Sequence, residues 1–248
     1  LPEKMRLRLT PKITSGNDVL HAEGLSKSFP DKKLFSNVNI DIKRGDKTAI
    51  IGPNGTGKST ILKILLGKTN CDGGEIRLGT NVHIGYYDQE QHNFDESKTI
   101  FQEISDEYPN MTNGEIRSVL AAFVFEGDDV FKTISSLSGG EKGRLSLAKI
   151  MLSKANFLIL DEPTNHLDIN SKEILENAIN SYDGTVLYVS HDRYFINKTA
   201  TKVLELTPDG MNQYLGNYDY YIEKKTLAKR EQELFGESSL PETNNIKQ

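Results

Sequence analysis

The sequence predicts an α/β fold built on a mainly parallel core sheet. Residues 47–52, 156–161 and 185–190 form nearly continuous apolar runs, which are typical of strands covered on both faces. Each run ends in a polar loop, and a helical pattern follows. This winding order joins parallel strands through helices, and it gathers ligand sites at the carboxyl ends of the strands.

Three further segments alternate apolar and polar residues with the period of a strand. They lie at 38–43, 74–79 and 82–87, and we expect half-buried, antiparallel strands there, in a separate β subdomain. Residues 207–210, Thr-Pro-Asp-Gly, are typical of a turn. We expect this turn to join two short strands.

Helical patterns complete the predicted fold. About fifty mostly helical residues lie between the loop at Gln89 and Ser138, and we expect a small α-helical subdomain at about 92–138. Gly67 and Gly184 each follow a helical pattern and are predicted helix stops. The predicted helices span 58–66, 98–107, 113–125, 140–153, 170–181 and 218–234.

Composition and charge restrict the class of protein. Of the 248 residues 36% are hydrophobic, and no apolar run approaches the roughly 20 residues of a membrane-spanning helix. The single cysteine excludes an internal disulfide framework and suits a reducing compartment, so we expect a cytoplasmic protein. The net charge of −5 argues against a surface that coats nucleic acid, and no DNA partner is expected.

The chain is expected to form one large domain with a short segment at each end. Residues 1–17 are basic at first and lack periodicity, and we expect them to be the end of a linker. Residues 18–217 form the predicted domain, and 218–248 form a C-terminal helical extension or tail with a second basic cluster. We interpret both basic segments as solvated. Because the sequence begins with Leu1, we expect it to be a fragment of a longer protein.

The segment after the first buried run is a complete phosphate-binding loop. It matches G-x-x-x-x-G-K-[ST] at every fixed position, between a strand and a helix. Glycines let backbone N–H groups wrap the phosphates, Lys58 supplies a point charge, and the Ser59 hydroxyl can bind Mg²⁺. The flanking strand and helix argue against a chance glycine-rich turn. The predicted nucleotide-binding residues are Gly52, Pro53, Asn54, Gly55, Thr56, Gly57, Lys58, Ser59 and Thr60.

Two carboxylates follow the second buried run. Asp161 is expected to hold the Mg²⁺ shell. Glu162 points the other way and is placed to orient the water that attacks the γ-phosphate, or to take its proton. Without a phosphate loop, this pair would indicate a surface loop or a helix cap. Together with that loop, it predicts a site that hydrolyses a nucleotide.

Three other side chains are candidates, each with a structural alternative. His191 ends the third buried run, where an imidazole could reach the γ-phosphate, although a lone histidine there is usually structural. Gln89 follows a strand and could bind Mg²⁺ or its water as a neutral amide. Phe29 could stack on a purine ring or fill the core. The predicted catalytic residues are Glu162, His191, Lys58 and Gln89, and the predicted metal ligands are Ser59, Gln89 and Asp161.

A second helix start has anion-binding chemistry. Ser138, Gly139 and Gly140 precede a helical pattern, where free backbone N–H groups and the positive end of the helix dipole would face an anion. One chain therefore carries two predicted phosphate sites.

Together these motifs resemble those of ATP-binding cassette (ABC) ATPases over about residues 18–215. The resemblance implies an ABC-type P-loop ATPase fold, hydrolysis of ATP with Mg²⁺, and a second cassette as partner, in the same parent chain or in a homodimer. In such pairs, Ser-Gly-Gly of one cassette closes on the γ-phosphate held by the phosphate loop of the other, which explains the two sites. Asp168 resembles a residue of the loop that links them. The motifs are the phosphate loop at 52–59, Gln89, LSGGE at 137–141, LILDEP at 158–163, NHLD at 165–168 and His191.

Several kinds of cassette share these motifs. DNA-repair cassettes are split by a long coiled coil, whereas the motifs lie close together here. EPTNHLD at 162–168 and SHDRYFI at 190–196 resemble the ABC-F group, whose members act on the ribosome in translation or antibiotic resistance. The sequence is most similar to their second cassette. The alternatives are the nucleotide-binding subunit of an ABC transporter and an ATP-driven clamp with another cytosolic client.

Two positions depart from the family pattern. Gly143 replaces a helix former within the predicted helix at 140–153, which would cost about 1 kcal/mol and loosen that helix. Phe29 stands where many cassettes have Tyr, a change that keeps ring stacking and removes the hydroxyl.

Overall fold

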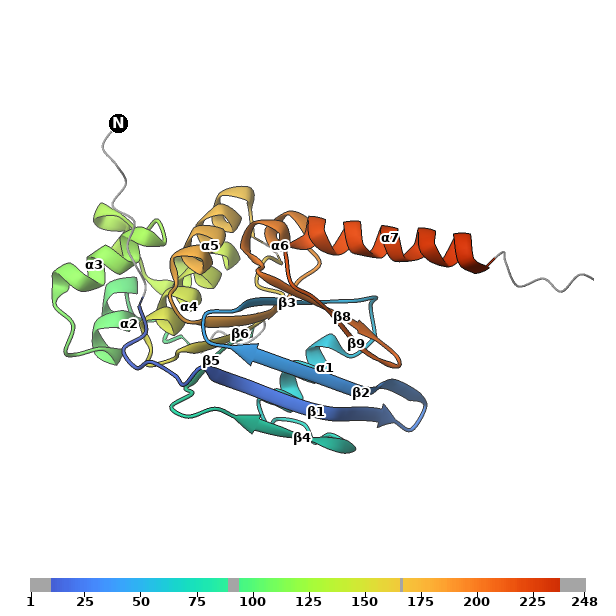
Figure 1. Cartoon of the computed structure of the whole chain (residues 1–248). Coiled ribbons are helices and arrows are strands. Elements are labelled where there is room, and N and C mark those ends of the chain that lie inside the picture. Colours follow the sequence, from blue (N-terminus) through green and yellow to red (C-terminus); the bar gives the residue numbers. More distant parts are fainter. Residues whose placement is uncertain (1–9, 89–93, 166, 237–248) are drawn as a thin grey trace, which may run out of the picture.

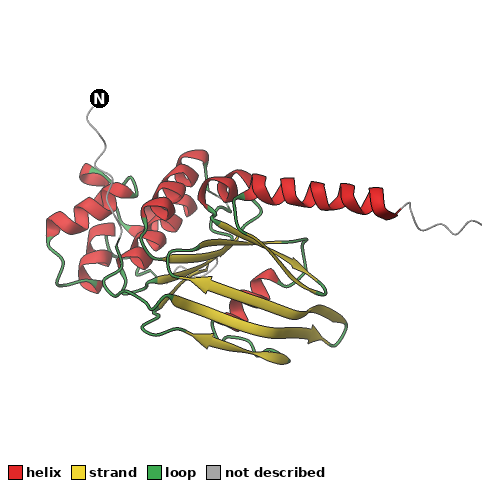
Figure 2. Ribbon diagram, viewed as in Figure 1, coloured by secondary structure: helices red, strands yellow, loops and turns green. Residues whose placement is uncertain are grey.

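A six-stranded sheet lies at the centre of the molecule (Figures 1 and 2). The structure, a computed structural model, describes residues 10–88, 94–165 and 167–236. The strand order is β5-β6-β7-β3-β8-β9; neighbours are parallel except β8 and β9. The three apolar runs form β3, β6 and β7, as predicted. The strands are β3 (Lys47–Ile51), β5 (Ile84–Asp88), β6 (Phe157–Asp161), β7 (Thr185–Val189), β8 (Lys202–Thr207) and β9 (Gly210–Tyr214).

The prediction for residues 82–87 is wrong in direction. These residues contribute to β5, which pairs in parallel with β6 at one edge of the core sheet and not within an antiparallel subdomain. An edge strand is only partly covered: Ile84, Gly85 and Tyr86 are half-buried, whereas Tyr87 is buried. The alternation of apolar and polar residues in the sequence reflects this partial cover and contains no information about the direction of the neighbouring strand.

A second sheet is three-stranded and antiparallel, in the order β2-β1-β4, as the alternation at 38–43 and 74–79 predicts. The long β1–β2 hairpin pairs with β4 along one edge, and α1 lies next to it (Figure 1). Apolar side chains of this sheet, of α1 and of one face of the core sheet form one hydrophobic cluster. The elements are β1 (Asp18–Phe29), β2 (Lys32–Lys43), β4 (Gly73–Leu78) and α1 (Lys58–Leu65).

Helices cover the other face of the core sheet. Side chains of these helices form a second cluster with the opposite face of the strands, and α2 and α3 gather at one end of the molecule as the small helical subdomain (Figure 1). The predicted ranges omit α6, a helix too short to show a period. The helices are α2 (Ile100–Glu107), α3 (Asn113–Ala122), α4 (Gly139–Leu152), α5 (Ile169–Ser181) and α6 (Arg193–Thr199), with 3₁₀ turns at Gly127–Phe131 and Ile134–Ser136.

Only one of the two predicted helix stops has that role. Gly67 has a φ of 68° and donates its N–H to the carbonyl of Ile64 at 2.9 Å, which closes the end of α1. Gly184, in contrast, lies beyond the end of α5 at Ser181. A Cβ at Gly184 would lie 2.4 Å from the ring of Tyr182. The glycine at 184 therefore serves a close approach to an aromatic ring.

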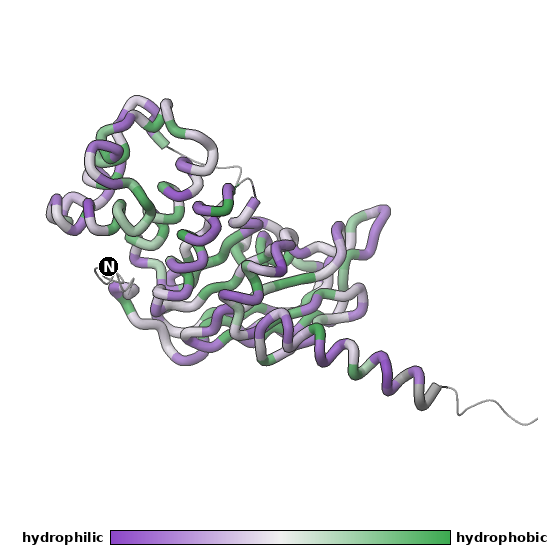
Figure 3. Tube along the Cα trace, turned by 90° about the horizontal axis from the view of Figure 1, so that it is seen from above, coloured by the Kyte–Doolittle hydropathy of each residue, from purple (hydrophilic) through white to green (hydrophobic). Residues whose placement is uncertain are grey.

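The C-terminal helix α7 (Tyr218–Gly236) packs only by its first turns and then extends away from the domain (Figure 1). Tyr221 is buried there and donates to Glu205 at 2.8 Å, and Lys225 pairs with the same carboxylate. Polar residues dominate the outer part of α7, whereas apolar residues are frequent along the central strands (Figure 3). Across the described residues, no helix combines the length and apolar character needed to cross a membrane.

Residues 10–17, within the expected linker, contact the domain. The side-chain amide of Asn156 donates to the carbonyl of Ile13 at 3.0 Å, and Arg44 donates to the carbonyl of Ser15 at 3.1 Å. Residues 1–9 and 237–248, which belong to the two expected terminal segments, lie outside the described part of the chain.

Candidate functional site

The phosphate loop runs from the end of β3 to the start of α1 and lies against the β1–β2 hairpin. Gly57 has a φ of 101°, and a Cβ there would lie 3.0 Å from the ring of Phe35 and 3.1 Å from Leu34. The N-cap of α1 is Gly57, which has no side chain to occupy the first N–H groups of the helix. These N–H groups at a positive helix end suit a phosphate.

Lys58 lies at the base of this loop. Its ammonium donates to the carbonyls of Gly52 at 2.9 Å and Pro53 at 3.0 Å, and the residue is buried. Burial lowers the pKa of Lys58, while Glu162 and Asp161 oppose that shift. The loop thus holds a cation on backbone carbonyls, and these acceptors can give way to phosphate oxygens.

Ser59 and Asp161 meet across the ends of two elements. The Ser59 hydroxyl, on the first turn of α1, donates to Oδ1 of Asp161, on the last residue of β6, at 3.0 Å. A hydroxyl and a carboxylate side by side are the hard oxygen ligands that Mg²⁺ prefers. The residues present therefore fit the predicted ion. Gln89, the third predicted ligand, lies outside the described residues.

Glu162 follows β6 in an unusual backbone conformation. Its φ is 47°, a left-handed value, and its N–H donates to the carbonyl of Val189 on β7 at 3.0 Å. Its carboxylate lies 3.4 Å from Nε2 of His191 and accepts the backbone N–H of His191 at 3.3 Å. Burial raises the pKa of Glu162, although His191 opposes that shift. A raised pKa makes this carboxylate a stronger base than an exposed one.

The fold thus brings five predicted residues to one edge of the core sheet. β3, β6 and β7 run in parallel, so the residues that follow them collect at their carboxyl ends. The five are Lys58, Ser59, Asp161, Glu162 and His191.

Sequence reasoning missed a buried hydroxyl pair beside this edge. Oγ1 of Thr164 and Oγ of Ser190 lie 3.1 Å apart, and Ser190 also accepts the N–H of Asp192 at 3.1 Å. The pair joins the loop after β6 to the loop after β7. A serine and a threonine 26 residues apart give no signal in the sequence.

Phe29 lies at the tip of the β1–β2 hairpin with half of its surface exposed, so core filling is excluded. The ammonium of Lys27 lies 5.4 Å from the centre of the Phe29 ring. This contact occupies part of the ring surface and leaves the ring half-exposed at the hairpin tip.

Residues 137–141, here called the signature segment, begin α4. Ser138 accepts the N–H of Glu141 at 3.3 Å, and the Glu141 carboxylate accepts the N–H of Ser138 at 2.9 Å, so the two residues form a capping box. Not every N–H at this helix start is therefore free. A Cβ on Gly139 would meet no atom within 4 Å, and one on Gly140 would meet only Ser171. The backbone at Gly139 and Gly140 is therefore open, whereas Leu137 is buried.

Gly143 does not interrupt α4, which runs unbroken from Gly139 to Leu152. A Cβ at Gly143 would lie 3.3 Å from the hydroxyl oxygen of Tyr87 and 3.5 Å from Leu167. The glycine therefore permits a close approach between α4 and β5, which gives a packing reason for this departure from the family pattern.

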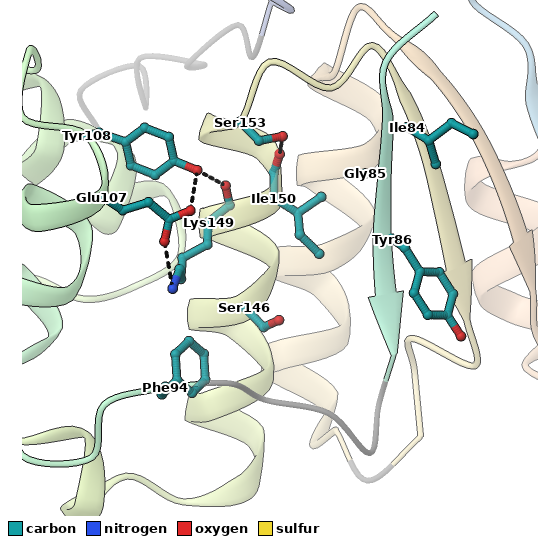
Figure 4. A pocket seen from close by; sticks show the side chains of 10 residues that line it. All are labelled: Ile84, Gly85, Tyr86, Phe94, Glu107, Tyr108, Ser146, Lys149, Ile150 and Ser153. Atoms are coloured by element: carbon teal, nitrogen blue, oxygen red, sulfur yellow. Dashed lines mark hydrogen bonds and ion pairs between the residues drawn. The ribbon is translucent and has the colours of Figure 1, made fainter. Parts of the chain in front are cut away.

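A pocket of about 280 Å³ lies elsewhere, between α2, α4 and β5 (Figure 4). Lys149 pairs there with Glu107 at 2.8 Å and with Glu103, and Tyr108 donates to the carbonyl of Lys149 at 2.9 Å. Its main charged groups are thus partnered within the chain. None of its lining residues belongs to the predicted site.

This arrangement of phosphate loop, strand-end carboxylates and signature segment defines a cassette-type P-loop ATPase domain. The model of the ABC transporter family matches residues 35–165, and the chain belongs to this family. The solved structure of cbiO1 from Clostridium perfringens, part of the ABC transporter complex cbiONQ, superposes with a TM-score of 0.67 at 25% identity, covering 88% of this chain and 95% of that one.

Curated relatives connect the chain with the F group of the family. It is 56% identical to the ATP-binding protein YdiF of Bacillus subtilis, over 86% of this chain and 33% of that protein. It is 43% identical to ABC transporter F family member 5 of Arabidopsis thaliana, over 97% of this chain and 35% of that protein. The energy-dependent translational throttle protein EttA of Haemophilus influenzae is 38% identical, with 91% and 42% covered. The chain spans about a third of the length of the first two relatives.

Proposed function

We propose that the chain is one half of an ATP-hydrolysing pair, in which its phosphate loop binds ATP and its signature segment faces the ATP of a second cassette. The open backbone at Gly139 carries this proposal, because a Cβ there would meet no atom within 4 Å. Ser138, in contrast, caps its own helix through Glu141. A triphosphate on the phosphate loop would lack these groups unless another copy or another cassette supplied them. Pairing would therefore complete both sites.

The residues at the strand ends suggest how hydrolysis proceeds. Lys58 would exchange its carbonyl acceptors for the β- and γ-phosphate oxygens. Ser59 and Asp161 would hold Mg²⁺, with Gln89 as a further ligand, and the ion would neutralise charge that develops on the phosphates. Glu162 would accept a proton from the attacking water, and His191 would hold the carboxylate of Glu162 in place through the contacts at 3.3 and 3.4 Å.

We further propose that the parent protein belongs to the ABC-F group, contains this chain as its second cassette and acts on the ribosome from the cytoplasm. The name of EttA, a translational throttle protein, supports a role in translation. The alternative is a transporter subunit, which the likeness to cbiO1 supports at lower identity. In the ABC-F proposal, residues 1–17 would be the end of the linker between the two cassettes, and residues 218–248 would be a C-terminal extension.

The test uses the full-length parent with Glu162→Gln. We expect this variant to bind ATP and remain paired, with turnover of the ATP on this phosphate loop reduced by roughly 10²–10⁴-fold, the usual contribution of a general base. Because burial raises the pKa of Glu162 in the folded state, the charge of its carboxylate costs more in the folded than in the unfolded chain. The Glu162→Gln variant should therefore be at least as stable to heat as the wild type. A loss of ATP turnover without a loss of thermal stability then reports on catalysis and not on folding.

The same variant tests whether the ribosome is the partner of the parent protein. Held in its ATP-bound state, it should co-sediment with ribosomes in ATP but not in ADP, with Lys58→Ala as the control whose phosphate loop in this cassette binds no nucleotide. Undiminished turnover would remove Glu162 from the mechanism. Recovery of a membrane subunit instead of ribosomes would favour the transporter alternative.

A further inference from the structure

The β1–β2 hairpin supports both ends of the expected nucleotide. Phe29, the expected base platform, is the last residue of β1 and pairs with Lys32, the first residue of β2. Further along β2, Phe35 and Leu34 lie directly against the phosphate loop, within 3.0–3.1 Å of a Cβ placed on Gly57. One two-stranded element thus underlies the ring that would stack on the base and the loop that would hold the phosphates.

A direct hydrogen bond joins the tip of this hairpin to the loop. The ammonium of Lys32 donates to the carbonyl of Gly55 at 2.8 Å. Gly55 is the middle glycine of the loop and has a φ of 73°, so its backbone is in a conformation that a single contact can help to hold. Lys32 is the described side chain of the hairpin tip that reaches the loop by a polar contact.

A second contact fixes the opposite side of the tip. The carboxylate of Asp72, in the loop after α1, accepts the N–H of Ser28 at 2.6 Å and pairs with Lys27 at 2.8 Å. These two bonds hold the pKa of Asp72 below its ordinary value. With Asp72 on one side and Gly55 on the other, the residues around Phe29 are held at two points.

We infer that Lys32 is a positioning residue for nucleotide binding, which aligns the phosphate loop with the base platform through the Gly55 carbonyl. The C=O and the following N–H of a trans peptide point in opposite directions. A Gly55 carbonyl held by Lys32 therefore turns the N–H of Thr56 to the other side of the loop. Loss of the ammonium would leave that peptide free to rotate. Phosphate binding would then have to order the loop, and this entropy cost would lower the affinity.

This inference rests on the proposed function, ATP binding at the phosphate loop, and is tested by calorimetric titration of the chain with ATP and with ADP. We expect Lys32→Met to lower the affinity for ATP and for ADP by the same factor, about 3- to 10-fold. This factor corresponds to the net free energy of one hydrogen bond. Lys32→Arg should restore most of the affinity, because the guanidinium also donates. Lys33→Met is the matched control, because Lys33 is the next residue on β2, is exposed like Lys32, and its loss removes the same charge from the hairpin tip.

The thermal midpoint of Lys32→Met should equal that of the wild type, and in the paired parent its KM for ATP should rise while kcat is unchanged. Equal affinities for Lys32→Met and wild type would overturn the inference. A loss confined to ATP would also overturn it, since that result indicates a contact with the γ-phosphate. An equal loss in Lys33→Met would show a general charge effect. Lys58→Ala reports on the proposed function separately: if it binds ATP as the wild type does, the phosphate-loop assignment itself fails.

Discussion

Gly57→Ala tests whether the phosphate loop depends on its contact with the β1–β2 hairpin. The substitution has two consequences. At a φ of 101° a residue with a Cβ is strained, which costs about 1–3 kcal/mol. The new methyl group would also lie 3.0 Å from two atoms of the Phe35 ring, and overpacking of this kind costs about 1–3 kcal/mol. Phe35 is fully buried, so its ring has little room to move. We expect a total loss of about 2–6 kcal/mol in the free energy of unfolding.

Urea unfolding of the chain measures this loss, with Gly67→Ala as the matched control. Gly67 also has a positive φ, 68°, but a Cβ there would meet no atom within 4 Å. This variant should lose only the backbone term, about 1–2 kcal/mol. Phe35→Leu added to Gly57→Ala should recover part of the difference, because the two residues are in contact. The reasoning is refuted if Gly57→Ala and Gly67→Ala are equally stable, or if the two changes at 57 and 35 simply add.

Two other predictions concern buried and capping groups. Lys47 is buried at the start of β3 and donates to the carbonyls of Tyr182 and Gly184, each at 2.5 Å, and burial lowers its pKa to about 8 from 10.5. Between these two pKa values the folded state binds fewer protons than the unfolded state. The unfolding free energy of the wild type, relative to that of Lys47→Met, should therefore rise by roughly 1–3 kcal/mol from pH 7 to pH 10. A free-energy difference between the two proteins that does not change with pH would contradict this prediction. Ser138→Ala removes the cap of α4 and should lower the unfolding free energy by about 0.5–2 kcal/mol, while ATP affinity of the isolated chain should stay unchanged, because the signature segment is open in this chain. A loss of ATP affinity in calorimetry of that variant would place Ser138 at the chain's own nucleotide.

Much of the candidate site can be predicted from the sequence because its parts are local. The phosphate loop is one continuous segment between a strand and a helix, and Asp161 with Glu162 directly follows an apolar run. Once these runs are placed in a parallel sheet, their following residues must meet at one edge. This is why Lys58, Ser59 and Asp161 are found together.

Other features arise from contacts that sequence patterns do not contain. The left-handed φ of Glu162 accompanies a hydrogen bond to Val189, which is 27 residues away along the chain. The pair Thr164–Ser190 and the bond from Lys32 to Gly55 likewise join segments that no motif connects. Such contacts depend on how the loops pack, and periodicity reports only how each segment is covered.

The sequence by itself determined the α/β class, the phosphate loop, the order of the family motifs and most helices, because each depends on residues that are neighbours along the chain. The tertiary structure alone decided that β5 runs parallel to β6, that Tyr87 approaches α4 closely at Gly143 and that the β1–β2 hairpin packs against the phosphate loop. Strand direction and close approach are relations between distant segments. Their energies appear only when the chain has brought those segments together.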